Sequence, residues 1–527
     1  HYKGGGRASY HPKMMLKIIV YAYTQKVYSC RQIARLIREN IPAMWLAAMQ
    51  TPDYRTINMF RGVRMRHFID DVFESIILKL LDEGYISFAN YFLDGTKIEA
   101  NANRYTFVWK KATLTYKEKL KEKIRETIEQ INEITDLEAK EIGQGSDFTE
   151  LELEEIADAL EEKADKLDKK IEENNYPKKQ KEVKKDRSKL KNTARQIKED
   201  FIPRMRKYDL YLKICGDRNS FAKTDPAATF MRMKEDHMKN GQLKPGHNVK
   251  MATENQFVLC YSIHQNRTDT RCFIPHLEKL ADTSLPMPKR VIADAGYGSE
   301  ENYLYAIGDD KEPRFEFLIP YNTYSKEKTR KYKRDIKNVK NWDYQAEDDY
   351  FICPNKRKVP FKKYVNKRNH SGYVQSYKVY ECEDCSGCPL KSLCTKSKGN
   401  RKVYWNPVYE EMKAKVRQAL ECDENAQIYA QRKIEVESVF GHIKGNRRFR
   451  RFSLRGLIKV HIEFGIVAIA HNIVKIALQR GLSSDENNKR KWDQEKNLQP
   501  LAFIFGLFGK PLFTFFGFAG CFPDFVR

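Results

Sequence analysis

Apolar residues follow helical spacing in some segments of the chain and extended spacing in others. From position 11 to position 83 they recur at intervals of three and four, which predicts a small all-helical unit. Ser29 precedes the run RQIARLIREN and is expected to cap its helix. Two short helices with a tight break suit a helix-turn-helix that reads DNA, although such pairs are more often plain helical packing, and both interpretations stay open.

The first extended segment is NYFLDGTKIEANANRY, in which aromatic and aliphatic residues lead into Asp94 and Gly95. Asp94 stands either within a strand or at its end. Because Asp-Gly is also the commonest hairpin turn signal, the local sequence favours a turn at this point.

Further extended segments follow in the middle of the chain. Residues 248–263 read as two strands joined by a turn, and residues 274–280 as a helix. Arg290–Ala293 reads as a buried strand that delivers Asp294 at its end, and Ser299 is expected to cap the next helix. A strand-end acid before a glycine-rich turn is a frequent site of ligand or metal binding in open α/β sheets.

Between about 113 and 201 the composition turns to Lys and Glu with spaced apolar residues, which predicts long helices in a hairpin or short coiled coil. Breaks are expected at GQGSDF (143–148) and NNYP (174–177). Residues 457–478 are apolar nearly all round but carry His and Glu, so we expect a core helix and not a membrane span. The Phe- and Gly-rich tail after position 500 has no assigned role.

Charge narrows the class of partner. Lys plus Arg number 96 against 71 Asp plus Glu, a formal charge of +25, which favours nucleic acid or an anionic surface. With 41% hydrophobic residues the chain is expected to fold. No signal-peptide pattern opens the sequence, so we expect a cytoplasmic protein, associated with the nucleoid if DNA is its partner.

The stretch 429–452, YAQRKIEVESVFGHIKGNRRFRRF, joins an acid to a basic run. Read as one helix, it places Glu437 on a face with Lys433 and Lys444. A carboxylate aimed at a polyanion needs a metal between them, whereas a plain surface ion pair of Glu437 with Lys433 is the alternative. The residues expected to hold a DNA backbone are Lys433, Lys444, Arg447, Arg448, Arg450 and Arg451.

Five of the eleven cysteines crowd into one region of the sequence: Cys353, Cys382, Cys385, Cys388 and Cys394. Two-residue gaps let neighbouring thiolates grip one ion, so we expect four of the five to bind a structural zinc ion. A redox role is the alternative, although no thioredoxin-like βαβ pattern surrounds the motif.

Asp94, Asp294 and Glu437 are three acids on separate elements, and here the sequence resembles the DDE transposases of bacterial insertion sequences, most closely the family numbered eleven eighty-two. The resemblance covers His11 to about Leu478. Its motifs are YHPKMMLKIIVYAY, PDYRTINMFR, YFLDGTKIEANANRY, TDPAATFMRMK, VIADAGYGSEENY, CEDCSGCP and RKIEVESVFGHIKGNRRFRRF.

The resemblance implies an α/β protein with a ribonuclease H-like catalytic core, in which the three acids bind two Mg²⁺ or Mn²⁺ ions. Related transposases carry a Tyr-x2-Arg-x3-Glu-x6-Lys signature. Lys444 stands at the matching distance from Glu437, but Tyr429 and Arg432 each come one residue early, and the matching positions hold Ala430 and Lys433.

The expected organisation has seven parts. They are an N-terminal helical, DNA-binding domain (1–85), the first part of the catalytic core (86–112), a helical insert (113–205), the core continued (206–320), a basic and Cys-rich insert (321–425), the final catalytic helices (426–482) and a tail (483–527).

The expected function is DNA cleavage at transposon ends and strand transfer into target DNA, performed by a homodimer or higher oligomer on DNA. Two alternatives stay open: a ribonuclease H-fold nuclease without strand transfer, and a non-enzymatic zinc-containing DNA-binding protein.

Overall fold

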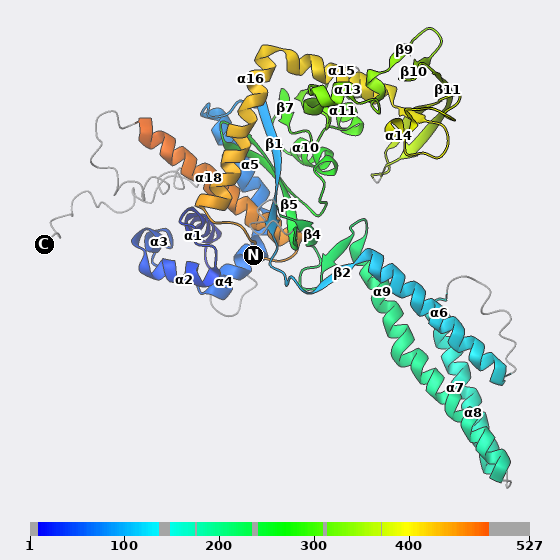
Figure 1. Ribbon diagram of the computed structural model, residues 1–527. Helices are drawn as coiled ribbons and strands as arrows, with labels where there is room; N and C mark the ends of the chain where they lie inside the picture. Colours follow the sequence, from blue (N-terminus) through cyan, green and yellow to red (C-terminus); the bar gives the residue numbers. More distant parts are fainter. Residues whose placement is uncertain are drawn as a thin grey trace. The chain divides into compact units, whose positions relative to one another are not determined.

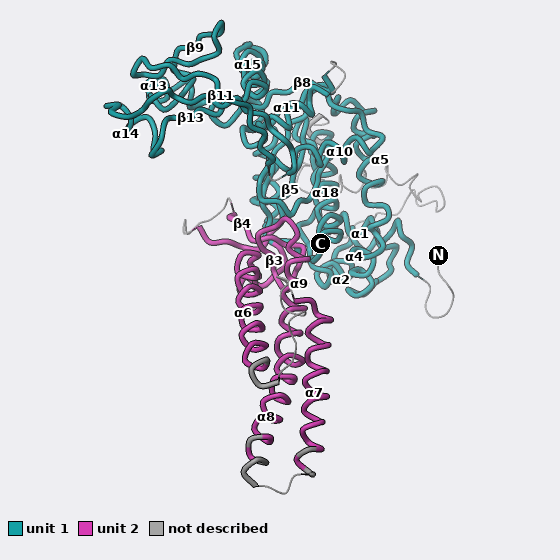
Figure 2. The backbone as a smooth tube through the Cα atoms, turned by 90° about the vertical axis from the view of Figure 1, so that its right-hand side faces the viewer, with its two compact units in different colours: residues 1–99, 247–527 teal, residues 100–246 magenta. Residues whose placement is uncertain are grey.

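The computed structural model describes residues 9–135, 148–173, 177–233, 241–308, 313–369 and 371–483 of the chain. Its contacts divide the chain into two compact units, residues 1–99 with 247–527 and residues 100–246 (Figure 2). The predicted break at 143–148 lies almost wholly outside the described residues, as do positions 174–176 and the tail from 484 onward.

The first unit opens with helices, as the spacing of apolar residues predicts. They are α1 (Pro12–Thr24), α2 (Cys30–Glu39), α3 (Ile41–Leu46), α4 (Tyr54–Gly62) and α5 (Ile69–Asp82) (Figure 1). Ser29 occupies the N-cap position of α2, but its side chain makes no capping hydrogen bond, so that part of the expectation is wrong. Asn40 and Asp53 cap α3 and α4 through their side chains.

A central sheet follows. Its strands are β1 (Asn90–Glu99), β5 (Leu243–Glu254), β6 (Phe257–His264), β7 (Arg290–Ala293) and β8 (Glu316–Leu318), with β5, β1, β7 and β8 side by side and β6 paired with β5. β7 runs parallel to both β1 and β8. The predicted strands are confirmed, and Asn255 and Gln256, both with positive φ, form the turn between β5 and β6.

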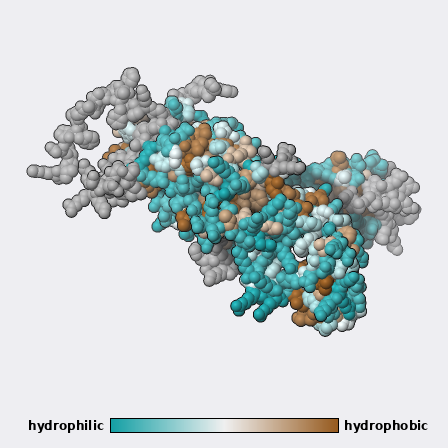
Figure 3. Space-filling model, turned by 90° about the horizontal axis from the view of Figure 1, so that it is seen from above, coloured by the Kyte–Doolittle hydropathy of each residue, from teal (hydrophilic) through white to brown (hydrophobic). Residues whose placement is uncertain are grey.

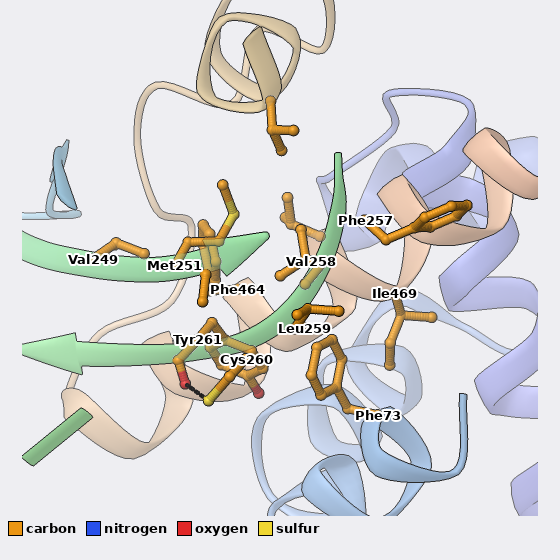
Figure 4. Close-up of a cluster of buried hydrophobic side chains, with 14 of the residues drawn as sticks. Phe73, Val249, Met251, Phe257, Val258, Leu259, Cys260, Tyr261, Phe464 and Ile469 are labelled. Carbon is orange, nitrogen blue, oxygen red and sulfur yellow. Dashed lines mark hydrogen bonds between the residues drawn. The ribbon is translucent and has the colours of Figure 1, made fainter. Parts of the chain in front are cut away.

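Helices α10 (Phe273–Ala281), α11 (Glu300–Ile307), α15 (Pro407–Glu421) and α18 (Leu457–Ser483) pack in the same unit. α18 contacts β6, α1 and α5, and its Phe464 and Ile469 lie among the buried side chains of β5, β6 and α5 (Figure 4). Residues Leu457–Arg480 are long and apolar enough to cross a membrane, but 72% of their most apolar window is buried inside the protein. The prediction of a core helix is confirmed.

A second, five-stranded antiparallel sheet forms the Cys-rich region. Its order is β13 (Lys402–Trp405), β12 (Val374–Glu381), β11 (Lys358–Arg368), β10 (Tyr350–Ile352) and β9 (Asp343–Gln345). Trp342, Phe351, Tyr380, Cys382 and Cys385 belong to its own small core.

The second unit is mainly helical. It contains α6 (Lys110–Thr135), α7 (Glu150–Glu173), α8 (Pro177–Gln196), a π-helical turn (Ile197–Phe201) and α9 (Ile202–Cys215), which pack around apolar side chains such as Ile124, Leu153 and Phe201. The described helices of this unit begin at Lys110 and end at Cys215, and the bounds 113–205 of a helical insert stay a prediction. Short strands β2 (Phe107–Trp109) and β3 (Ser220–Ala222) pair at its base, and β4 (Thr229–Arg232) pairs with residues 243–246.

Candidate active site

Asp94 and Asp294 lie on neighbouring strands of the central sheet. Leu93 of β1 pairs in parallel register with Ala293 of β7, so the acids that follow them stand at the same level. Asp94 is only 4% exposed. Burial and then the negative charge of Asp94 raise the pKa of Asp294, although a hydrogen bond from the Gly296 backbone N–H (2.9 Å) opposes the shift.

Gly95 lies inside β1, so the predicted hairpin turn at Asp94 and Gly95 is wrong. A Cβ atom at position 95 would collide with the ammonium group of Lys250, which reaches across from β5. The glycine is therefore required by close packing inside a strand. Nothing within the motif distinguishes this reason from a turn, because the neighbour comes from a strand about 150 residues away.

The segment that carries Glu437 is not one regular helix. α16 (Asp423–Arg432) continues into a π-helical turn (Lys433–Glu437), then α17 (Ser438–Gly441) and a second π-helical turn (His442–Asn446). A π turn repeats at five residues where an α turn repeats at about four. Glu437 therefore aligns with Arg432 and not with Lys433, which is exposed.

Arg432 connects the acids on the two elements. One terminal nitrogen of its guanidinium lies 3.7 Å from Asp94 Oδ2, and the other lies 3.6 Å from Glu437 Oε1. Glu437 therefore contacts Arg432. This contact replaces both the expected face with Lys433 and Lys444 and the alternative ion pair with Lys433. The π turn also explains why Tyr429 and Arg432 come one residue early in the transposase signature, because the extra residue is absorbed between Arg432 and Glu437.

Tyr429 lies one turn before Arg432, with its ring centre 6.0 Å from the guanidinium carbon. Burial raises the pKa of Tyr429, and the charges of Asp294 and Asp94 raise it further while Arg432 opposes them. The phenol therefore stays protonated beside the acids. The nearby Glu435 is engaged elsewhere, since its carboxylate accepts a 2.7 Å hydrogen bond from the Gln256 backbone N–H.

Two of the six predicted DNA contacts point inward. Lys444 is buried and donates to the Lys97 carbonyl oxygen at 3.0 Å, and Arg447 is buried and donates to the Tyr23 carbonyl oxygen at 3.1 Å. Their positions contradict the expectation of a direct contact with DNA, because each cation is used to satisfy a backbone carbonyl inside the protein. The four predicted contacts that remain exposed are Lys433, Arg448, Arg450 and Arg451.

Arg447 belongs to a buried polar network that joins the N-terminal helices to the core. Glu463 of α18 is fully buried, and it accepts hydrogen bonds from the backbone N–H groups of Ser453 and Leu454. Burial raises the pKa of Glu463, and the charge of Arg61 in α4 opposes that shift. Arg61 in turn donates to the Tyr23 hydroxyl at 2.8 Å.

The five clustered cysteines line one small cavity of about 20 Å³. Burial and the neighbouring thiol of Cys385 raise the pKa of Cys382 to about 12. None of the five forms a disulfide. Within the described ranges, no group of three or more His, Cys, Asp or Glu side chains is arranged to hold a metal ion, which applies both to these cysteines and to the three acids.

The sequence motifs did not identify two residues beside the acids, Lys250 and Asp269. Lys250 is fully buried in β5 and ion-paired with Asp269, whose charge also raises the pKa of Asp294. A lysine inside the apolar strand pattern NVKMAT is the signal that indicates such a partner, because a buried ammonium is rarely left unpaired.

Two segments of the chain match models of known protein families. Residues 352–477 match a model described as "Transposase DDE domain", and residues 1–62 match one described as "Transposase domain (DUF772)". No curated protein and no solved structure matches the chain. The first match includes the cysteine cluster, Arg432 and Glu437, and the second includes helices α1 to α4.

Proposed function

We propose that this chain, an insertion-sequence transposase by its two matched domains, cuts DNA at transposon ends and joins the ends to target DNA. Its motifs favour the insertion-sequence family numbered eleven eighty-two. Asp94, Asp294 and Glu437 are the catalytic acids. The observation that carries the proposal is the side-by-side placement of Asp94 and Asp294 on parallel strands, with Arg432 linking Asp94 to Glu437.

We assign the central sheet to the ribonuclease H-like fold. The support is that two adjacent parallel strands in its middle bring Asp94, inside β1, level with Asp294, directly after β7, where such sheets place ligand sites. The π-helical turn contacts β1, which brings the element with Glu437 against the strand with Asp94. The two inserts lie between these elements in the sequence.

The acids suit divalent metal in their chemistry. Mg²⁺ and Mn²⁺ prefer carboxylate oxygens, and two neighbouring carboxylates of which one has a raised pKa are stabilised when a cation neutralises them. Asp94 and Asp294 would hold the metal, with Glu437 as the third ligand. When bound, a pair of such ions activates water and stabilises the leaving oxygen of a phosphodiester.

The residues around the acids balance charge and hold the element with Glu437 in place. Arg432 balances the charge of Asp94 and Glu437, and its guanidinium suits a phosphate at the same place. The ring of the protonated Tyr429 lies near the Arg432 guanidinium and supports it. Lys444 and Arg447 hold the chain around this element and do not meet DNA directly.

Exposed cations would hold the DNA backbone outside the site. These are Lys433, in the same π-helical turn as Glu437, and Arg448, Arg450 and Arg451, which come shortly after it. Most of the coloured residues in Figure 3 are hydrophilic, with hydrophobic ones in smaller patches, and the formal charge of +25 suits a polyanionic partner. We assign recognition of the transposon ends to the N-terminal helices, and we expect a homodimer or higher oligomer because two ends must be joined.

A structural zinc ion bound by four of the five clustered cysteines is a second part of the proposal. It is supported by the five thiols that line one cavity. Zinc requires thiolates, so binding must displace protons and draw the sulfur atoms inward from their present arrangement. Metal analysis of protein purified without chelator tests this, and a stoichiometric disulfide in place of zinc would favour the redox alternative.

A joining assay tests the catalytic proposal. Purified protein is incubated with its flanking DNA and Mg²⁺, and with pre-cut transposon ends, and the products are sequenced. Asp94→Asn, Asp294→Asn and Glu437→Gln should each reduce cleavage and joining by on the order of a hundredfold or more. Glu411→Gln, at an exposed acid paired with Lys415, is the control.

The outcome separates the three functions. Cleavage without joining of pre-cut ends indicates a nuclease. Activity or DNA binding that is unchanged by all three substitutions indicates a DNA-binding protein in which these acids have no chemical role.

A further inference from the structure

An ion pair between a buried lysine and a partly exposed aspartate lies next to the acids. Lys250 in β5 has no exposed surface, and its ammonium pairs with the carboxylate of Asp269, in the loop before helix α10. The same ammonium lies against Gly95, the residue after Asp94, and 5.0 Å from the ring centre of Tyr297. Lys250 therefore fixes the backbone beside one catalytic acid.

Asp269 fixes the loop after the other acid. Its Oδ2 lies 3.5 Å from where a Cβ of Gly296 would stand, so the carboxylate packs directly on that loop. The next residue, Thr270, donates from its hydroxyl to the Gly296 carbonyl oxygen at 2.8 Å. Asn248 of β5 donates to Asp269 Oδ1 at 3.2 Å and holds the carboxylate in place.

We propose that Lys250 and Asp269 are a positioning pair that sets the separation of Asp94 and Asp294 and balances the charge around their metal site. The proposal rests on the proposed function, in which those two acids hold divalent metal. Through its two members, the ion pair contacts both the residue after Asp94 and the loop after Asp294. Neither member contacts the reacting atoms.

The pair affects the electrostatic potential at the site as well as the packing of the strands. Desolvating an ammonium and a carboxylate is costly, and an apolar pair of similar size would hold the strands together at least as well. A charged pair placed here adds something that an apolar pair lacks. It puts a fixed positive and a fixed negative charge beside a site that binds a cation.

The test uses Mn²⁺ alone as the probe, with affinity measured by calorimetry on the full chain without DNA. Lys250→Met leaves Asp269 uncompensated next to the site, so the dissociation constant for Mn²⁺ should fall by on the order of tenfold. Asp269→Asn leaves the ammonium uncompensated, so the constant should rise by on the order of tenfold. The double variant removes both charges and should return to within about threefold of the original protein.

Opposite shifts and recovery in the double variant distinguish a charge-balancing pair from a merely structural one. Shifts in the same direction, or no shift, would overturn the proposal. Lys279→Met is the control, because Lys279 is a partly exposed lysine that pairs with Asp70 at 3.2 Å and not with Asp269, and it should leave Mn²⁺ affinity unchanged. If Lys250→Met does not fold, weaker Mn²⁺ binding in Asp269→Asn that recovers in the double variant supports the pair, and a shift that persists in the double variant, or no shift, overturns it.

Failure of this proposal is distinct from failure of the proposed function. If the original protein binds no Mn²⁺, or if Asp294→Asn binds it equally well, the assignment of the metal site is wrong and the positioning pair is overturned with it. If binding depends on Asp294 but does not respond in opposite directions to the two single substitutions, only the positioning pair is overturned.

Discussion

Removal of the Arg432 guanidinium should lower the rate of strand cleavage and shift its pH dependence. At 3.7 Å from Asp94, an ion pair in a setting with an effective dielectric of about 20 has a Coulomb energy of about 4 kcal/mol. Desolvation of the two groups returns much of that energy. We therefore expect Arg432→Gln to lose on the order of 1 to 2 kcal/mol of stabilisation at the site, a factor of roughly 5 to 30 in rate.

The pH dependence gives the sign. Arg432 lowers the pKa of Asp294, so its removal should raise that pKa above its already raised value. If metal binding needs the ionised carboxylate, activity on the acid side is lost at a higher pH than in the original protein. The assay is the initial rate of Mg²⁺-dependent strand cleavage across pH 5 to 9.

Two further variants make this prediction specific. Arg432→Lys keeps the charge and should restore part of the rate and most of the pH profile. Arg417→Gln, which removes a guanidinium 3.0 Å from Glu327 in another part of the unit, should leave both unchanged. An acid limb that stays in place in Arg432→Gln, or moves to lower pH, would refute the reasoning.

Changes at Asp294, at Gly95 and at the clustered cysteines should each alter the stability of the protein. Because burial and Asp94 raise the pKa of Asp294, its ionised form lowers the stability of the folded protein, so Asp294→Asn should raise the melting temperature at pH 7. This gain should vanish below the ordinary aspartate pKa of 3.8, where residue 294 is protonated in both the folded and the unfolded chain. A gain that stays the same across pH would contradict this. Gly95→Ala should lower the free energy of unfolding by about 1 to 3 kcal/mol, because the added methyl group collides with Lys250. Gly441→Ala, in a helix with open space around it, should not lower the free energy of unfolding, and denaturant titration measures both variants. Removal of zinc by a chelator should lower the melting temperature, and serine in place of any zinc-binding cysteine should abolish that response while the exposed Cys422→Ser retains it.

Local signals were sufficient for part of the site. The strand Arg290–Ala293, the acid after it and the helix capped by Ser299 are all found where the sequence places them, and the Ser299 hydroxyl accepts a 3.3 Å hydrogen bond from the Asn302 backbone N–H. Each of these features depends on residues within one turn of each other. The strands on either side of Asn255 are of the same kind.

Other features depend on neighbours that no local pattern contains. The Asp-Gly pair at 94 and 95 lies within a strand, and position 95 is glycine because Lys250 occupies the space that a side chain would need. Arg447 is buried because Tyr23, more than 400 residues earlier, offers its carbonyl oxygen. The register of Arg432 with Glu437 depends on a π turn, which a count of residues per α-helical turn misplaces by one.

The central claim is that Asp94, Asp294 and Glu437 share one metal site, and cleavage of the protein backbone by bound iron tests it most directly. Fe²⁺ takes the place of Mg²⁺, and peroxide with ascorbate produces radicals that cut the chain only near the ion. A shared site predicts cuts near residues 94, 294 and 437 in the same preparation, all suppressed by excess Mg²⁺ and all lost in Asp294→Asn. Cuts near only one of these positions, or at none of them, would contradict it.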